Sequence, residues 1–473
     1  MNDNELMACQ PVPKAVAAMA IPSVISSLVT VVYNMADTFF VGQTGDALQV
    51  AAVSLTNPIF ILLMAFANMF GMGGSAAASI AMGEGDEERT RRVSAFVTYA
   101  SLAVGVVFCA LLLGFMRPIL TLFGADADTY ELARGYALHI SYGAPFIIWS
   151  AAASFVVRAE GASKEAMTGS MIGTVANILL DPLFISGLGM GAAGAAIATT
   201  LGNVLASLYY LWYFVKKSRA FSLRPDDFTL GQRIPMQVCS TGLPTAIFSA
   251  LMSLSIIVLN QILAAYGNVP VAAIGIVFKA NMFITFLQMG LANGVQPLLG
   301  YSYGAGDEKR FRRVERFTKR CCLVVGVAAT ALFYFLRTPI VRLFIDDADV
   351  VACGVTMLVA YMLSGPVIGL LFMNMNCMQS TGNSLPATVV SVLRQGILLI
   401  PMLYLLNACF GLNGVIYGQA LTDYLAVGIS ALLWHRQRAW PGASGGEINE
   451  ADWAKRPDFC SNAEPGRFLR FFE

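Results

Sequence analysis

Residues 83–87 read Gly-Glu-Gly-Asp-Glu, and residues 304–308 read Gly-Ala-Gly-Asp-Glu, 221 residues later. The sequence around the two pentapeptides repeats at nearly the same distance. The repeated pairs are Ala51-Ala52-Val53 with Ala272-Ala273-Ile274, Arg92 with Arg313, Leu122 with Leu343, Asp128 with Asp349, Pro145 with Pro366, Gly161 with Gly382, Pro22 with Pro244 and Gly194 with Gly414. An offset that stays within one residue of 221 over this length indicates that one unit has been duplicated.

Long apolar segments surround these repeats. Of the 473 residues, 57% are hydrophobic and 12% are charged, whereas soluble proteins carry roughly a quarter charged residues. A bilayer core needs about 20 apolar residues per helix. Twelve segments meet this length: 15–41, 50–81, 93–116, 132–157, 166–186, 191–215, 238–266, 271–302, 318–336, 350–378, 386–406 and 413–434. We therefore predict an all-α polytopic membrane protein with twelve transmembrane helices in two pseudo-symmetric six-helix bundles.

The duplication also predicts the domain boundaries. Because six is an even number, both copies enter the membrane in the same orientation, and two such halves suit alternating access. The expected divisions are an N-terminal segment 1–14, an N-lobe 15–215, a linker 216–237, a C-lobe 238–436 and a tail 437–473.

Lysine and arginine predict the orientation. Of the 30 in the chain, two lie inside helices and four lie in or beside the loops after helices 3 and 9, which leaves 30 − 2 − 4 = 24. These fall at the termini or beside the loops after helices 2, 4, 6, 8 and 10. Since such residues are retained in the cytoplasm, we expect both termini there and a location in the plasma (inner) membrane.

Ionisable side chains inside the apolar segments are candidates for function, because a charge in the bilayer costs at least a few kcal/mol. The candidates are Asp37, His139, Asp181, Lys279, Arg394 and Asp423. In helix 1, Tyr33 and Asn34 lie four and three residues before Asp37 and share its face.

Helices 5 and 6 carry the matching polar groups. Asn177 and Asp181 are four residues apart on helix 5, and Thr199 lies in an Ala- and Gly-rich stretch of helix 6. Two carboxylates, an amide and a hydroxyl suit a hard cation such as Na⁺. The same carboxylates in a low-dielectric pocket could instead carry a proton. The alternative is that Asp37 and Asp181 only hydrogen-bond between helices.

These stretches resemble the multidrug and toxic compound extrusion (MATE) transporters over about residues 13–436. The resemblance is carried by Ile21-Pro22, Asn34-x-x-Asp37-Thr38, the Gly83-x-Gly85-Asp86 and Gly304-Ala305-Gly306-Asp307 turns, Gln296-Pro297 and Asn177-x-x-x-Asp181-Pro182. It implies a secondary exporter of organic, cationic or amphipathic drugs or metabolites, driven by inward H⁺ or Na⁺ movement and needing no other cofactor.

The resemblance also implies roles for single residues. Asp37, Asn177, Asp181 and Thr199 match the family's cation site, and Pro22 matches the proline at which helix 1 is proposed to bend. Some members add a Glu in helix 7 and an Asp in helix 10. Neither helix has a carboxylate here, so the chain looks like the DinF-like branch, and the choice between Na⁺ and H⁺ stays open.

In the C-lobe, Arg394 and Asp423 could line the cleft or form a structural ion pair. Lys279 could face the cleft or snorkel, and His139 is interpreted as a packing residue. The residues expected to contact substrate are Lys279, Met282, Phe283, Phe286, Gln288, Met289, Asn293, Asn374, Met375 and Arg394. Met-rich surfaces can adapt to different shapes, although most single Met or Phe side chains pack between helices.

Other functions fit less well. The sequence offers no nucleophile triad, metal cluster or nucleotide motif, so we predict no enzyme, and it has no basic domain for nucleic acid. A flippase of lipid-linked or amphipathic precursors with a related fold is the alternative, although such proteins usually have more helices and more cavity charge. Expected partners are small organic substrates and membrane lipid, without an obligate protein partner.

Overall fold

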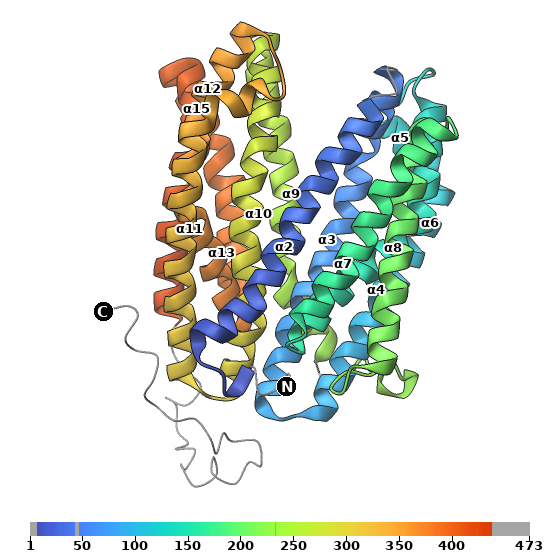
Figure 1. Cartoon of the computed structure of the whole chain (residues 1–473), viewed down its shortest axis with the longest axis vertical. Coiled ribbons are helices and arrows are strands. Elements are labelled where there is room, and N and C mark those ends of the chain that lie inside the picture. Colours follow the sequence, from blue (N-terminus) through green and yellow to red (C-terminus); the bar gives the residue numbers. More distant parts are fainter. Residues whose placement is uncertain (1–6, 43–46, 232, 438–473) are drawn as a thin grey trace.

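The computed structural model describes residues 7–42, 47–231 and 233–437, and every regular element in these residues is helical (Figure 1). The first half contains α2 (Val12–Gly42), α3 (Ala47–Glu84), α4 (Glu87–Gly114), α5 (Met116–Leu122), α6 (Tyr130–Ala159), α7 (Ser163–Pro182), the π-helical turn η1 (Leu183–Gly187) and α8 (Gly191–Lys216). The 3₁₀ turn η2 (Pro225–Asp227) lies in the connection that follows.

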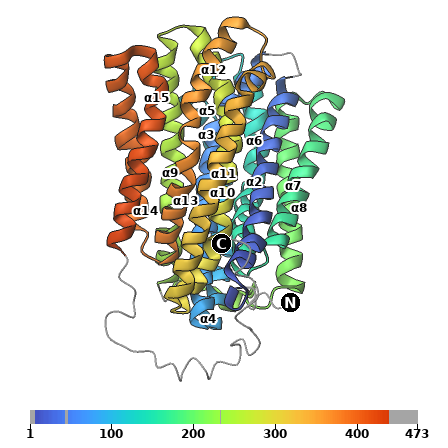
Figure 2. The ribbon, with the colours of Figure 1, turned by 60° about the vertical axis from the view of Figure 1, so that its left-hand side comes forward.

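The second half has the same plan. It contains α9 (Ile234–Ala264), α10 (Asn268–Gly304), α11 (Glu308–Arg342), α12 (Ala348–Met362), α13 (Gly365–Ser380), α14 (Leu385–Val392), the π-helical turn η3 (Leu393–Leu398) and α15 (Leu399–Arg436). The long helices run side by side along one axis in both views (Figures 1 and 2).

The number of membrane spans depends on two broken helices. Ten helices in the described residues are long and apolar enough to span, or eleven if α12 and α13, bent by 44°, form one span. The tenth runs over 52 residues, from Leu385 to Arg436. At 1.5 Å per residue it would be about 78 Å long, more than twice a bilayer core of about 30 Å. Its backbone is non-helical at Gly411 (φ 61°, ψ −142°). Division there gives 11 + 1 = 12 spans, so the all-helical membrane fold is confirmed.

The helices form two bundles that separate toward one end (Figure 1). We call the end with the α3–α4 turn at Gly85 and the α10–α11 turn at Gly306 the glycine-turn end, and the opposite end the α5 end. The bundles lie together at the glycine-turn end and diverge toward the α5 end.

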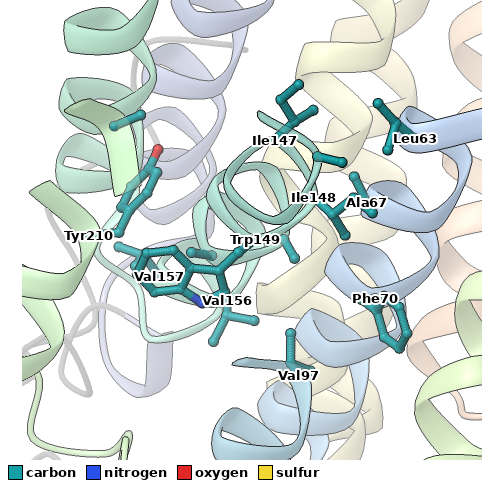
Figure 3. Packing of buried hydrophobic residues seen from close by; sticks show 14 of the residues in the cluster. Leu63, Ala67, Phe70, Val97, Ile147, Ile148, Trp149, Val156, Val157 and Tyr210 are labelled. Atoms are coloured by element: carbon teal, nitrogen blue, oxygen red, sulfur yellow. The ribbon is translucent and has the colours of Figure 1, made fainter. Parts of the chain in front are cut away.

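The first helix of each half crosses between the bundles. At the start of α2, Val16 and Met19 are buried in one cluster with Leu298 and Leu299 of α10. At the start of α9, Ile234 and Val238 are instead buried in the main cluster of the first half. That cluster joins α3, α4, α6 and α8, and part of it is shown in Figure 3. Each bundle therefore holds the beginning of a helix from the other half.

Small residues bring α3 and α10 together at the glycine-turn end. The Ser75 hydroxyl donates to Gln296 Oε1 at 2.9 Å, and the two residues are themselves 221 positions apart. Farther along, a methyl group at Gly83 would lie 2.2 Å from the Tyr301 carbonyl oxygen, and one at Gly304 would lie 2.1 Å from that of Ile80. Equivalent positions of the duplicated unit thus meet across the crossing.

Candidate functional site

The polar groups predicted for helices 5 and 6 come together in the first bundle. Asn177 and Asp181 lie one turn apart on α7, and Thr199 lies on the neighbouring α8. Their exposed fractions are 3%, 0% and 4%. A carboxylate removed from solvent to this degree requires hydrogen bonds or a cation.

Asn177 connects the other two residues. Its amide lies 3.2 Å from Thr199 Oγ1, and in the orientation that gives both groups a partner its nitrogen donates to Asp181 Oδ2 at 3.0 Å. Its oxygen then accepts from Thr199. The amide orientation is assigned from this network. The three side chains form one continuous polar cluster, which we call the α7–α8 cluster.

Helix α2 contributes the hydroxyl of Tyr33. That oxygen lies 3.4 Å from Thr199 Oγ1, and either group can be the donor. Asn34 donates to the Thr30 carbonyl of its own helix at 2.9 Å. The backbone of Asp37 belongs to α2, but its side chain lies outside the described part of the structure, so the meeting of Asp37 with Asp181 stays a prediction.

The chain changes its helical pattern directly after Asp181. Pro182 has no N–H, so the Ile178 carbonyl loses its α-helical donor. The next five residues form the π-helical turn η1, whose end is fixed by a 2.8 Å hydrogen bond from Leu188 N to the Leu183 carbonyl. π-Helical turns are rare in proteins, and those that occur are often found at functional sites. Asp181 therefore lies at a local break in its helix.

The second bundle contains a buried ion pair. Arg394 Nε donates to Asp423 Oδ1 at 2.7 Å, and the exposed fractions of the two side chains are 6% and 2%. Gln419 donates to the same carboxylate oxygen at 3.1 Å. The guanidinium also lies 5.1 Å from the centre of the Phe248 ring. This is the structural ion pair that the sequence left open as one reading of these residues.

Three buried residues expected at the substrate cleft make hydrogen bonds or ion pairs between helices. Gln288 is fully buried and donates to the carbonyls of Cys322 and Gly365, and Asn374 is 2% exposed and donates to Ser430 Oγ. Arg394 is the third, through its ion pair. These contacts give the three residues a packing role, and their contact with a substrate stays a prediction.

The remaining expected contacts are distributed over α10 and α13. Lys279, Met282, Phe283, Phe286 and Met289 are half-buried on α10. Asn293 accepts from Asn376 Nδ2 at 3.0 Å, and Met375 is buried. His139 lies 2.7 Å from the Gly135 carbonyl of its own helix, which agrees with a packing role.

Sequence reasoning missed the hydrogen bond between Ser75 and Gln296, which joins the two halves. Gln296 carries part of the family resemblance, and Ser75 is its equivalent in the duplicated unit, so the offset of 221 could have identified the pair. In the described residues, no three His, Cys, Asp or Glu side chains form a metal-binding group. The oxygen atoms of the α7–α8 cluster nevertheless fit a small hard cation, because such ions take carboxylate and carbonyl ligands.

Comparison with known proteins gives consistent relatives. The MatE family profile matches residues 22–183 and 244–405, two segments whose starts are 222 residues apart. The multidrug export protein MepA of Staphylococcus saprophyticus is 31% identical over 89% of this chain and 92% of its own length. MepA of Staphylococcus aureus strain MSSA476 is 32% identical over 92% of this chain and 96% of its own.

Solved structures show the same fold. One described as the outward-facing conformation of a multidrug resistance MATE family transporter has a TM-score of 0.88 at 24% identity, covering 92% of this chain and 98% of its own. A transporter from Pyrococcus furiosus, described as having a binding pocket of reverse polarity, has a TM-score of 0.86 at 24% identity with the same coverage. Two profile matches that together cover more than half of the chain, and relatives above 30% identity along most of it, show that this protein belongs to the MatE family of multi-pass membrane transporters.

Proposed function

We propose that this protein exports small organic compounds in exchange for an inward-moving cation, either H⁺ or Na⁺. The α7–α8 cluster carries the proposal, because it buries a carboxylate at a helix break inside a membrane span. The MepA relatives are described as multidrug export proteins and match almost the full length of this chain. Drugs or metabolites of cationic or amphipathic character are the proposed substrates.

The cation neutralises Asp181. A charged side chain within the bilayer costs at least a few kcal/mol, and a proton or Na⁺ bound there removes that cost. The Asn177 amide and the Thr199 hydroxyl can serve either ion, since they can donate to a carboxylate or present oxygen to a metal. Asp37 and Tyr33 would complete the site from α2, with Asn34 on the same helix face.

Alternating access would link the ion to the substrate. The bundles are together at the glycine-turn end and apart at the α5 end, and a solved structure of the same fold is described as an outward-facing conformation. Ion binding at the α2–α7–α8 junction would change how α2 packs, with Pro22 as its bend point. Substrate would bind between the bundles, against the half-buried Met and Phe side chains of α10.

The glycine-turn end would face the cytoplasm, with both termini, because most Lys and Arg residues lie there. The DinF-like branch stays a proposal that rests on the lack of carboxylates in the predicted helices 7 and 10. A flippase is less well supported. Arg394, one of the few candidate cavity cations, is neutralised by Asp423.

Transport in vesicles tests this function. Purified protein would be placed in vesicles loaded with an organic-cation dye, and Na⁺ and pH gradients would be imposed separately. We expect dye movement to follow at least one gradient. Asp181→Asn and Asp37→Asn should each reduce the gradient-driven rate at least tenfold, because a neutral amide cannot bind the coupling ion electrostatically.

Asp226→Asn is the matched control, since Asp226 is an exposed carboxylate in the connection between the halves. It should transport like the parent protein. Dye movement that depends on neither gradient would remove the antiport proposal. Full coupled transport by both Asp181→Asn and Asp37→Asn would remove the site while leaving export intact.

A further inference from the structure

One face of α11 carries an unusual density of positive charge near the glycine-turn end. Its members are exposed and spaced three, one, three and four residues apart, which places them on one helix face. They are Lys309, Arg312, Arg313, Arg316 and Arg320, and we call them the basic stripe. From first to last they extend about 16 Å along the helix axis.

The same face continues as an apolar surface. Leu323, Val324 and Val327 follow in register and are 42%, 67% and 50% exposed. The opposite face, with Phe311 and Val314, is buried in the protein. A helix face that changes from apolar to basic within one turn matches the boundary between hydrocarbon and lipid headgroups.

Little of this charge is neutralised by ion pairs within the part of the chain that the structure describes. Within the described residues, Arg312 pairs with Glu308, and no carboxylate pairs with Lys309, Arg313, Arg316 or Arg320. The carboxylate of Glu315 belongs to the other side of the helix, where it accepts from Trp434 and Lys319.

The equivalent face of α4 keeps two of the five basic residues and lacks the other three. Subtracting 221 from the stripe positions gives Glu88, Arg91, Arg92, Ala95 and Tyr99. The two arginines pair with Glu87 and Glu88, Ala95 is fully buried, and Tyr99 donates to the Leu223 carbonyl at 2.7 Å. The connection between the halves therefore covers the Ala95–Tyr99 part of this face in the first bundle. The exposed charges of Lys309, Arg316 and Arg320 on α11 are not a property of the duplicated unit, whereas Arg312 and Arg313 match Arg91 and Arg92.

We propose that the basic stripe binds the phosphate headgroups of anionic phospholipids. Guanidinium groups pair with phosphate through two parallel hydrogen bonds. The adjoining apolar face accommodates the acyl chains of the same lipids, which a free phosphate ion lacks. The binding does not require export, so it stands or falls independently of the proposed function.

The test uses the full-length protein in detergent, titrated with phosphatidylglycerol, phosphatidylcholine or inorganic phosphate, with bound lipid measured by native mass spectrometry. The variant is Arg313→Gln/Arg316→Gln/Arg320→Gln. The control, Arg91→Gln/Arg92→Gln/Arg224→Gln, removes two arginines from the first half and one from the connection that follows it. Each Lys or Arg near an anionic surface contributes about fivefold, so we expect roughly a hundredfold weaker phosphatidylglycerol binding in the variant.

The control should stay within about twofold of the parent protein, and phosphatidylcholine should bind all three proteins alike. Thermal unfolding in phosphatidylcholine shows whether the variant is folded. Three results would overturn the proposal: parent-like phosphatidylglycerol binding by the folded variant, an equal loss in the control, or displacement of the lipid by millimolar inorganic phosphate.

Discussion

At the residue scale, Thr199 is the side chain that connects the three helices of the candidate site. Its hydroxyl lies within hydrogen-bond distance of both Asn177 and Tyr33, so it joins α7, α8 and α2. Its neighbour Thr200 has a different task and donates to the His139 carbonyl at 3.0 Å. Of these two adjacent threonines, Thr199 belongs to the candidate site and Thr200 only packs between helices. A variant of each therefore distinguishes a loss of coupling from a loss of packing.

Thr199→Val should weaken coupling more than Thr200→Val. The valine removes a hydroxyl from the α7–α8 cluster, while the Asn177 amide keeps Asp181 and the Thr199 backbone N–H as partners, so the loss is that of one hydrogen bond, about 0.5–1.5 kcal/mol. We expect the concentration of coupling ion that gives half-maximal dye efflux to rise roughly two- to tenfold, by the same energy. Thr200→Val should lower thermal stability and leave that concentration unchanged. Equal shifts in the two variants would show that Thr199 also acts only in packing.

At the element scale, the contact between α3 and α10 depends on residues without bulky side chains. A methyl group at Gly304 would lie 2.1 Å from the Ile80 carbonyl oxygen, so the helices could not stay as close. Gly275, on the same helix, has open space where its side chain would be. Small residues allow membrane helices to approach closely, and this crossing holds the glycine-turn end together.

Gly304→Val should therefore favour the conformation in which the glycine-turn end is open. The measurement is labelling of a cysteine placed at Ser75, which is 1% exposed, in a protein whose other cysteines have been replaced. We expect labelling by a membrane-impermeant thiol reagent to accelerate at least tenfold with Gly304→Val. Gly275→Val should have no effect. Unchanged labelling in the Gly304 variant would mean that the crossing does not restrain this end.

Elements also show how much the sequence could predict. Hydropathy located the spans. For α11, however, the predicted segment 318–336 covers only the apolar part, because the helix begins ten residues earlier, in the segment that carries the basic stripe. The sequence predicts one helix over 350–378, whereas α12 and α13 bend by 44° just before Pro366. The two π-helical turns leave no hydropathy signal. Gln288 and Asn374 could not be assigned either, because only the fold decides whether a polar side chain meets a carbonyl or a cavity.

At the scale of the whole molecule, the duplication determines how the halves hold each other. α2 begins in the cluster of the second bundle, and α9 begins in that of the first. Because each bundle buries the start of a helix from the other half, a rocking motion of one bundle must either move that segment with it or break its packing. Arg89 and Arg310, at equivalent positions, each hold one of these starting segments. Arg89 donates to Gln237 of α9 at 2.8 Å, and Arg310 donates to the Gln10 carbonyl before α2 at 3.1 Å.

If the two hydrogen bonds are equivalent, their effects on the equilibrium between the two conformations should be equal and additive. Replacing either arginine by glutamine removes a hydrogen bond worth about 1 kcal/mol, which corresponds to roughly a fivefold shift of the equilibrium between the two conformations. Since the sites share no partner, Arg89→Gln/Arg310→Gln should shift it roughly twenty-fivefold. Distances between spin labels on the α3–α4 and α10–α11 turns would measure both populations. If one single variant behaves like the parent protein and the double variant equals the other single variant, one contact alone restrains the glycine-turn end, and the pseudo-symmetry of the fold does not extend to its energetics.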